Sequence, residues 1–477
     1  MGTEWPRHGL CGTLTILLSL FAAFTPLAGS TGKPRLIVLT DIGGDPDDQQ
    51  SMVRLLVYSN EFDIEGLIAS ASGTPGELKR SVVQPHLIRE MVEAYGKVRS
   101  NLVRHHDGFP AAQTLLDVIK PGNPNRGVAH LGPEQDTEGS RWIISVVDRT
   151  DSRPVNVAIW GGAHDLAQAL WRVRRDRSAA DLGRFIAKLR VHSIGHQDDT
   201  GPWILDNFPK LFFILSSADS ADVLGKTKGT IDRRMSVYRG MYLGGDEALT
   251  SREWIDGNVR FGHGPLGALY PPKTWTAPNP HSALKEGDTP SWFYFLPHGL
   301  NDPEHPEWGG WGGRFRRIRD RYFGDAQDRV GDAEDARATV WRWRPAFQAG
   351  FAARMDWSFN AQRAAANHDP VAVLQGDRTR GMIRVSVRSG NRVRLSARGS
   401  SDPDGNRISY RWFHYPEPGG SAQPIDLGDS QAEELSFRAP ELSNEMDLHI
   451  VLEVKDTGTP ALSAYRRAIV RVTTSGQ

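Results

Sequence analysis

Hydrophobic and polar positions follow two different patterns along the chain. Between residues 34 and 215, short apolar runs rich in β-branched residues alternate with segments whose apolar residues recur at helical spacing. Continuous apolar runs are typical of buried parallel strands, and strands that alternate with helices form βαβ units. The pattern therefore predicts an α/β domain with a mostly parallel sheet flanked by helices.

The predicted strands of this domain end at turns, and helices follow several of them. Strands are expected at residues 35–40, 62–69, 155–160, 188–194 and 211–215. Helices are expected at residues 48–58, within 77–95, and at 164–173. Gly161 and Gly162 form the turn between the third strand and its helix.

Beyond about residue 370 the runs become shorter and alternate between apolar and polar positions. Strands are predicted at residues 383–387, 392–397, 408–413, 435–437, 448–454 and 467–472. Turn signals such as Ser389-Gly390-Asn391 separate them, and this spacing predicts a small immunoglobulin-like β-sandwich. We therefore expect an α/β domain at residues 31–365 and a β-sandwich at residues 372–477.

The first 30 residues are predicted to be a signal peptide. An apolar run at residues 10–28 follows Arg7 and His8, and Ala28 and Ser30 form a small-residue cleavage pattern. An uncleaved anchor is the alternative, because about 20 apolar residues can span a bilayer. The peptide predicts a secreted or periplasmic protein that has no membrane contact after cleavage.

Composition excludes several classes of function and of metal site. The 57 basic residues balance the 57 acidic residues, which argues against a protein that binds a nucleic-acid polymer or an anionic membrane. The single cysteine, Cys11, lies in the predicted signal peptide, so intramolecular disulfides and cysteine-rich metal sites are excluded. Length and apolar content suffice for a full hydrophobic core.

An acidic loop follows the first predicted strand. Asp41, Asp45, Asp47 and Asp48 lie within eight residues, between that strand and a helix. Ligands of open α/β sheets bind at this end of the strands, and clustered carboxylates repel one another unless a cation lies between them. Oxygen ligands suit Ca²⁺ or Mg²⁺. The alternative is a solvated turn in which Asp45 or Asp47 caps the helix.

Two segments carry a resemblance to a known family. The sequence RLIVLTDIGGDPDDQQSMVRLL at residues 35–56 is similar to the first motif of the inosine–uridine nucleoside hydrolases, D-x-D-P-G-x-D-D. Together with EGDTPSWFYFLPHGLNDPEHPEWGGWGGRF at residues 286–315, it resembles the nucleoside hydrolase-like, cellulose-binding Sde182-type family. Members also end in a β-sandwich with SSDPDG and YRW, here at residues 400–405 and 410–412.

The resemblance assigns roles to the acidic loop. It implies that Asp41 belongs to the calcium site, that Asp48 binds Ca²⁺ and that Asp47 holds sugar hydroxyls. Gly43 stands where the hydrolases have an aspartate that binds calcium and serves as the base for the attacking water. Asp45 is the nearest carboxylate that could replace it, so Asp45 is the predicted catalytic base.

Other positions follow from the same resemblance. The main-chain carbonyl of Trp160 and the carboxylate of Asp288 are expected to complete the calcium site. Thr74 and Asn207 align with two sugar-binding asparagines. Protonation of the leaving group needs a donor, for which His196, His263 and His298 are candidates, although each is more often an ordinary core or loop residue.

Aromatic residues bear on the size of the ligand. Trp308 and Trp311, separated by glycines, could place two indole faces beside a sugar ring. The alternative is that they fill the core of a large domain. As a pair near the expected cleft, they favour a carbohydrate larger than a free nucleoside.

The function expected from all these features is an exported, calcium-dependent hydrolase of N- or O-glycosidic bonds. Its ligand would be a nucleoside-type small molecule or a carbohydrate, including a polysaccharide. The alternative is a carbohydrate- or cellulose-binding protein that keeps the hydrolase fold but has lost catalysis with the aspartate at position 43. The sequence does not predict an oligomeric state.

Overall fold

The computed structural model describes residues 1–2, 25–26, 32–74, 76–217, 233–274, 283–420 and 425–474. The predicted signal peptide lies almost wholly outside these ranges. Within them, no helix combines the length and apolar character that a bilayer span requires.

The described α/β domain is built on an eight-stranded sheet with strand order β4-β3-β2-β5-β6-β7-β9-β8. All neighbouring strands are parallel except β8 and β9, which pair antiparallel at one edge. The strands are β2 (Arg35–Thr40), β3 (Asp63–Ala69), β4 (Ile119–Pro121), β5 (Val155–Ile159), β6 (Leu189–Ile194), β7 (Phe212–Ser216), β8 (Phe315–Arg319) and β9 (Tyr322–Asp325). This architecture confirms the predicted α/β fold.

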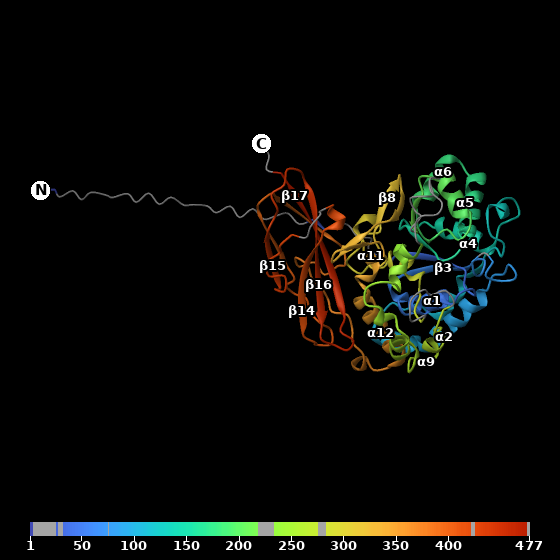
Figure 1. Ribbon diagram of the computed structural model, residues 1–477, viewed down its shortest axis with the longest axis horizontal. Helices are drawn as coiled ribbons and strands as arrows, with labels where there is room; N and C mark the ends of the chain where they lie inside the picture. Colours follow the sequence, from blue (N-terminus) through green and yellow to red (C-terminus); the bar gives the residue numbers. More distant parts are fainter. Residues whose placement is uncertain are drawn as a thin grey trace.

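Helices cover both faces of this sheet, which explains why the central strands read as continuous apolar runs (Figure 1). Leu36 and Val38 of β2 point to one face, whereas Ile37 and Leu39 point to the other, because successive side chains of a strand alternate. The first face packs against α1 (Asp47–Val57), α2 (Pro85–His105) and α12 (Arg344–Phe359). The second packs against α4 (Glu138–Val147), α5 (His164–Asp176), α6 (Ala179–Ala187) and α7 (Thr200–Asn207).

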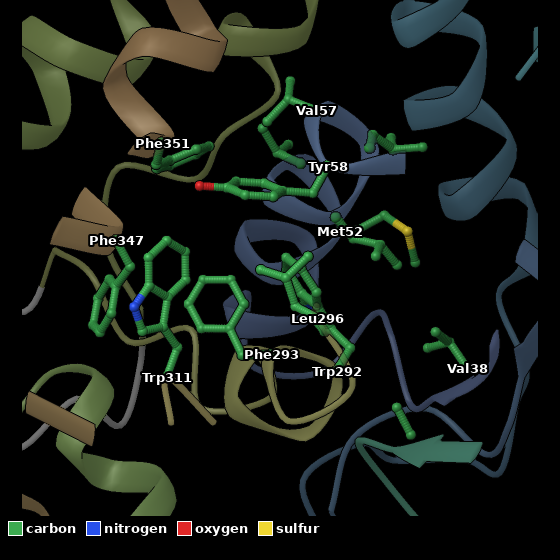
Figure 2. Close-up of a cluster of buried hydrophobic side chains, with 14 of the residues drawn as sticks. Val38, Met52, Val57, Tyr58, Trp292, Phe293, Leu296, Trp311, Phe347 and Phe351 are labelled. Atoms are coloured by element: carbon green, nitrogen blue, oxygen red, sulfur yellow. The ribbon is translucent and has the colours of Figure 1, made fainter. Parts of the chain in front are cut away.

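Aromatic residues fill the larger of these two cores. Trp292, Phe293, Trp311 and Phe347 lie beside Tyr58 at the end of α1 (Figure 2). Trp292 and Phe293 belong to the short helix α10 (Thr289–Phe293). The remaining short elements are α3 (Ala112–Asp117), α8 (Arg252–Ile255), α9 (Gly264–Ala268), α11 (Ala338–Trp341), β10 (Asp328–Val330) and β11 (Ala333–Asp335).

The helix expected within residues 77–95 begins later and continues further. It starts at Pro85, a residue suited to the first turn of a helix because its missing N–H would have no helical partner there, and it runs to His105. Residues 77–84 are turns and irregular chain instead. This difference leaves the preceding segment free to line the site described below.

The C-terminal part folds into two further sheets, as predicted. One sheet has the order β1-β12-β17-β16-β14 and the other consists of β13 and β15. The C-terminal strands are β12 (Ile383–Arg388), β13 (Arg392–Ser396), β14 (Ile408–Tyr415), β15 (Glu434–Arg438), β16 (Met446–Asp456) and β17 (Ser463–Thr473). β1 (Thr25–Pro26) comes from the predicted signal peptide and pairs with β12 at the edge of the larger sheet. Val393, Leu395 and Phe437 of the small sheet share a core with Leu448 and Ile450 of the large one.

The sandwich is docked against the α/β domain through buried polar contacts. Asp328 of β10 is fully buried and accepts a hydrogen bond from the Tyr415 hydroxyl of β14 at 2.6 Å. It also binds Arg314 at 2.6 Å and Arg342 at 2.8 Å. Arg467 of β17 donates to the carbonyl oxygen of Trp308 at 2.7 Å. Buried charge pairs demand matched partners, so these contacts fix how the two domains meet.

Candidate functional site

A polar cavity of about 360 Å³ opens at the carboxyl ends of the parallel strands. The loops that follow β2, β3, β5 and β6 all reach it, as expected for the ligand site of an open α/β sheet. Its lining includes Asp41, Asp45, Asp47, Asp48, Thr74, Glu77, Trp160, His196, Gln197, Tyr238, Arg239, Lys285 and Asp288. We call it the acidic pocket.

The turn after β2 depends on two glycines. Gly43 has a φ of +104°, which a residue with a side chain rarely adopts, and an added Cβ would lie 2.0 Å from Nε2 of Gln84. At Gly44 an added Cβ would lie 2.4 Å from the Cα of Gly73. The Gln84 amide also donates to the Gly43 carbonyl oxygen at 3.2 Å. A side chain at position 43 would therefore strain the backbone and displace the end of the Gln84 side chain.

The four aspartates of the loop all reach the acidic pocket and are nearly buried, with exposed fractions of 5 to 9%. Asp47 and Asp48 form the first turn of α1, where the helix dipole stabilises negative charge. The Thr40 hydroxyl donates a hydrogen bond to Asp48, and a guanidinium nitrogen of Arg126 lies 3.7 Å from Asp41.

Three carboxylates form a candidate metal centre. Asp47, Asp48 and Asp288 each offer one oxygen, and the three oxygens lie within 4.8 Å of one another. Among the described residues, Oδ2 of Asp288 is buried and has no hydrogen-bond partner. Calcium prefers such hard oxygen donors, so the residues present fit the ion that the resemblance implies.

Electrostatics support the same conclusion. Burial, together with the neighbouring carboxylates, raises the pKa of Asp48 and Asp288 well above the usual value. Burial also raises the pKa of Asp41 to about 7, although Arg126 opposes the shift. A divalent cation between these groups would remove the repulsion that the shifts reflect.

Trp160 also lies at the pocket, fully buried at the end of β5. Its indole nitrogen donates to Ser291 at 3.0 Å. Its main-chain carbonyl, the predicted metal ligand, accepts a hydrogen bond from the Gln197 side chain. A carbonyl oxygen has two lone pairs, so this bond leaves capacity for a second partner.

Several residues of the acidic pocket have no signal in the sequence, and Lys285 is the one with the closest contacts to the aspartates. Its ammonium nitrogen lies 2.7 Å from Oδ2 of Asp45 and 2.9 Å from Oδ2 of Asp47. Burial alone would lower the pKa of Lys285, but the carboxylates of Asp47 and Asp45 outweigh it and raise the pKa. No local pattern pairs residues 240 positions apart.

Of the two predicted sugar-binding residues, only Thr74 lies at the acidic pocket. Thr74 lies at the pocket, where its backbone N–H and hydroxyl donate to Glu77 at 2.6 and 3.1 Å. Asn207 does not: it ends α7, which leads from the pocket edge of the sheet back toward the start of β7. There it is exposed and binds Arg174 at 2.7 Å.

The two predicted platform tryptophans also lie elsewhere, at the contact between the domains. Each is only 7% exposed. The ring of Trp311 is stacked on His298, with centroids 4.8 Å apart, and packs against Phe293 (Figure 2). The ring of Trp308 is stacked on His305 at 3.9 Å. Since neither lines the acidic pocket, they serve the core and the domain contact.

Of the three candidate proton donors, His196 alone lines the acidic pocket. Neither of its ring nitrogens has a partner among the described residues, and burial lowers its pKa to about 4. It is therefore neutral at pH 7, with one N–H available as a hydrogen-bond donor. His263 instead binds Asp356 at 3.1 Å, and His298 accepts from the Trp311 backbone at 3.2 Å.

Comparison with known proteins gives consistent results. The family model described as cellulose-binding Sde182, nucleoside hydrolase-like domain, matches residues 35–315, and that of the cellulose-binding protein Sde0182, C-terminal domain, matches residues 392–472. A nucleoside hydrolase-related hypothetical protein from Saccharophagus degradans, associated with carbohydrate metabolism, is 33% identical, with a TM-score of 0.77 over 93% of this chain and 100% of that chain.

A second solved structure, the effector protein XOO4466, is 12% identical, with a TM-score of 0.35 over 69% of this chain and 95% of that chain. The search of curated proteins finds no match.

Proposed function

Because the chain belongs to the cellulose-binding Sde182 family, with its nucleoside hydrolase-like domain, we propose that it binds a saccharide in the acidic pocket and hydrolyses a glycosidic bond there with the help of a divalent cation. The observation that carries this proposal is the convergence of Asp47, Asp48 and Asp288 within 4.8 Å. Buried carboxylates packed this closely need either bound protons or a positive charge between them, and a divalent cation would supply that charge.

The residues of the acidic pocket would have different roles in such a reaction. Asp48 and Asp288 would hold Ca²⁺, with Asp47 shared between the cation and the sugar hydroxyls and the Trp160 carbonyl beside them. A bound cation of this kind lowers the pKa of a coordinated water. Asp41 and Asp45 line the same pocket and are the two carboxylates that could accept the proton.

The leaving group would be contacted from the part of the pocket wall that His196, Tyr238 and Arg239 line. His196 is neutral at pH 7, so its ring N–H can donate a hydrogen bond to a leaving oxygen or nitrogen but cannot supply a full charge. Tyr238 and Arg239 also line the acidic pocket and add hydrogen-bond donors. This assigns binding and orientation to that wall.

The second candidate function is carbohydrate binding without catalysis. Two observations favour it: Gln84 fills the space that the missing aspartate side chain at position 43 would need, and Lys285 holds the carboxylate nearest to it. The family description as cellulose-binding agrees with this alternative.

We also propose that the chain is exported, on the basis of its N-terminal apolar segment, and N-terminal sequencing of the secreted protein would test this.

The test combines three measurements on the purified protein. Calorimetry with CaCl₂ compares the wild type with Asp48→Ala, and Asp206→Asn serves as the control because Asp206 is exposed and lies on α7. Release of base or sugar from nucleosides, aryl glycosides and cello-oligosaccharides measures turnover. Sedimentation with insoluble cellulose measures binding.

The three outcomes are distinct. Calcium binding and turnover that Asp48→Ala abolishes together would support the hydrolase. Cellulose binding without turnover on any substrate would support the binding protein. Wild-type protein that binds no divalent cation would refute the metal centre.

A further inference from the structure

Lys285 and Asp288 reach the acidic pocket from one short segment, residues 283–288, that is held against one face of α1. Gln50 of α1 accepts hydrogen bonds from the backbone N–H groups of Lys285 at 2.9 Å and Glu286 at 3.3 Å. Its side-chain amide donates to the Ala283 carbonyl oxygen at 2.7 Å. The backbone of Lys285 is therefore fixed, and only its side chain can move.

A buried ion pair strengthens this attachment. The guanidinium of Arg54, one helical turn beyond Gln50, binds the carboxylate of Glu286 at 3.0 Å, and the Tyr270 hydroxyl donates to the same carboxylate at 2.6 Å. Glu286 has a φ of +39°, a conformation that a non-glycine residue keeps only when its surroundings fix it. The segment thus holds the backbone of Lys285 and of Asp288 at fixed positions beside the pocket, while the Lys285 side chain can still move.

Asp47 is the carboxylate that both the Lys285 ammonium and a divalent cation would contact. One of its oxygens lies 2.9 Å from the Lys285 ammonium, and it is also a member of the three-carboxylate group with Asp48 and Asp288. A cation in that group and the ammonium would repel each other across a single carboxylate. The side chain of Lys285 is 13% exposed, so it has a path to withdraw toward solvent.

We propose that Lys285 is the resident counter-ion of the acidic pocket: it competes with a divalent cation for Asp47 and so sets how tightly the pocket binds that cation. In the metal-free protein the ammonium holds Asp45 and Asp47 together and limits their repulsion. The inference rests on the proposed metal centre, and it makes Lys285 a positioning residue that acts through Asp47.

The experiment measures calcium affinity by calorimetry and metal-free thermal unfolding in EDTA for the wild type, Lys285→Met and Lys285→Arg. Lys285→Met should bind Ca²⁺ about 10- to 100-fold more tightly, since a nearby positive charge is removed. Its metal-free melting temperature should fall by about 2–6 °C, since two carboxylates lose their partner. Lys285→Arg should stay close to the wild type in both, as should Lys210→Met, which replaces an exposed lysine.

The proposal would be overturned if Lys285→Met bound calcium no more tightly than the wild type does. That result would mean that the ammonium does not compete with the cation. In that case wild-type calcium binding would still stand, and the proposed function with it. Absence of binding in both proteins would refute the metal centre and the competition together. If Lys285→Met folds only with calcium present, titration of the loaded protein with a chelator gives the same affinity comparison.

Discussion

The side chain of Gln84 occupies the space that any side chain at position 43 would need. An added Cβ on Gly43 would lie 2.0 Å from its Nε2 atom, while the same amide donates to the Gly43 carbonyl oxygen. A glycine at position 43 therefore fits both the backbone conformation of this loop and the packing of Gln84 against it.

Gly43→Asp should therefore lower the free energy of unfolding by about 2–4 kcal/mol, through a strained backbone and an overpacked contact. Combining it with Gln84→Ala should restore part of that loss, because the atoms that clash are removed. Urea denaturation of the four proteins of this cycle measures the coupling. A single variant as stable as the wild type would show that the loop rearranges freely.

Calcium should stabilise the protein more at pH 7.5 than at pH 5.5. The carboxylates of the pocket have a raised pKa, about 7 for Asp41, so the metal-free folded state loses stability as the pH rises from the unfolded value of 3.8 through that pKa. Protons and calcium also compete for the same oxygens. The melting temperature with and without calcium at both pH values tests this, and an equal increment at both would contradict it.

His192 should make the protein sensitive to acid. It is fully buried on β6 between the rings of Tyr294 and Phe315, and burial lowers its pKa to about 3. Because the unfolded state takes up the proton first, stability is lost as the pH falls below about 6.5, by about 2 kcal/mol at pH 5.

Replacing the ring by His192→Leu should remove that loss between pH 7.5 and pH 5, as read from urea denaturation at the two pH values. His86→Leu, at an exposed position on α2, is the matched control and should leave the slope unchanged. If the free energy of unfolding of His192→Leu changed with pH as much as that of the wild type, this histidine would be excluded as the acid-sensitive group.

Asp328 should be the most sensitive position of the domain contact. Burial would raise its pKa, but the charges of Arg314 and Arg342 lower it, so the carboxylate is ionised at neutral pH. Asp328→Ala leaves two partly buried guanidinium groups without their partner and should cost about 3–5 kcal/mol. Tyr415→Phe removes one hydrogen bond and should cost about 1 kcal/mol.

Thermal unfolding of these two variants tests the ranking. We expect Asp328→Ala to expose the linker near residue 370 to proteases, whereas Tyr415→Phe should stay resistant. Equal stability of the two variants would mean that Arg314 and Arg342 become hydrated in Asp328→Ala at no cost in free energy.

Features encoded locally could be predicted from the sequence. The strand at residues 35–40 matches β2 in both bounds because six consecutive residues are buried, and the acidic loop was recognisable because its carboxylates are neighbours in sequence. The helix expected within residues 77–95 is present, but α2 begins only at Pro85 and continues past that range to His105. Turn chemistry, not apolar spacing, sets that boundary.

Long-range relationships could not be predicted in this way. Lys285 reaches the acidic pocket, and Gln84 reaches the loop at Gly43, from segments whose own patterns say nothing about Asp45 or Gly43. Asn207 was placed by alignment of a motif, yet the direction of α7 takes it away from the pocket. Trp308 and Trp311 have the composition of a sugar platform, but Trp308 packs against the sandwich and Trp311 packs in the core of the α/β domain, and no local pattern reveals either neighbour.

Three residues on one face of α1 fix the spacing between the two halves of the pocket. Gln50, Ser51 and Arg54 hold the segment that carries Lys285 and Asp288, while Asp47 and Asp48 begin the same helix. One inserted residue in α1 would rotate the later contacts by about 100° relative to the ligands. Divergence of the ligand chemistry within this fold is thus expected at positions 285 and 288, with the helix face kept unchanged.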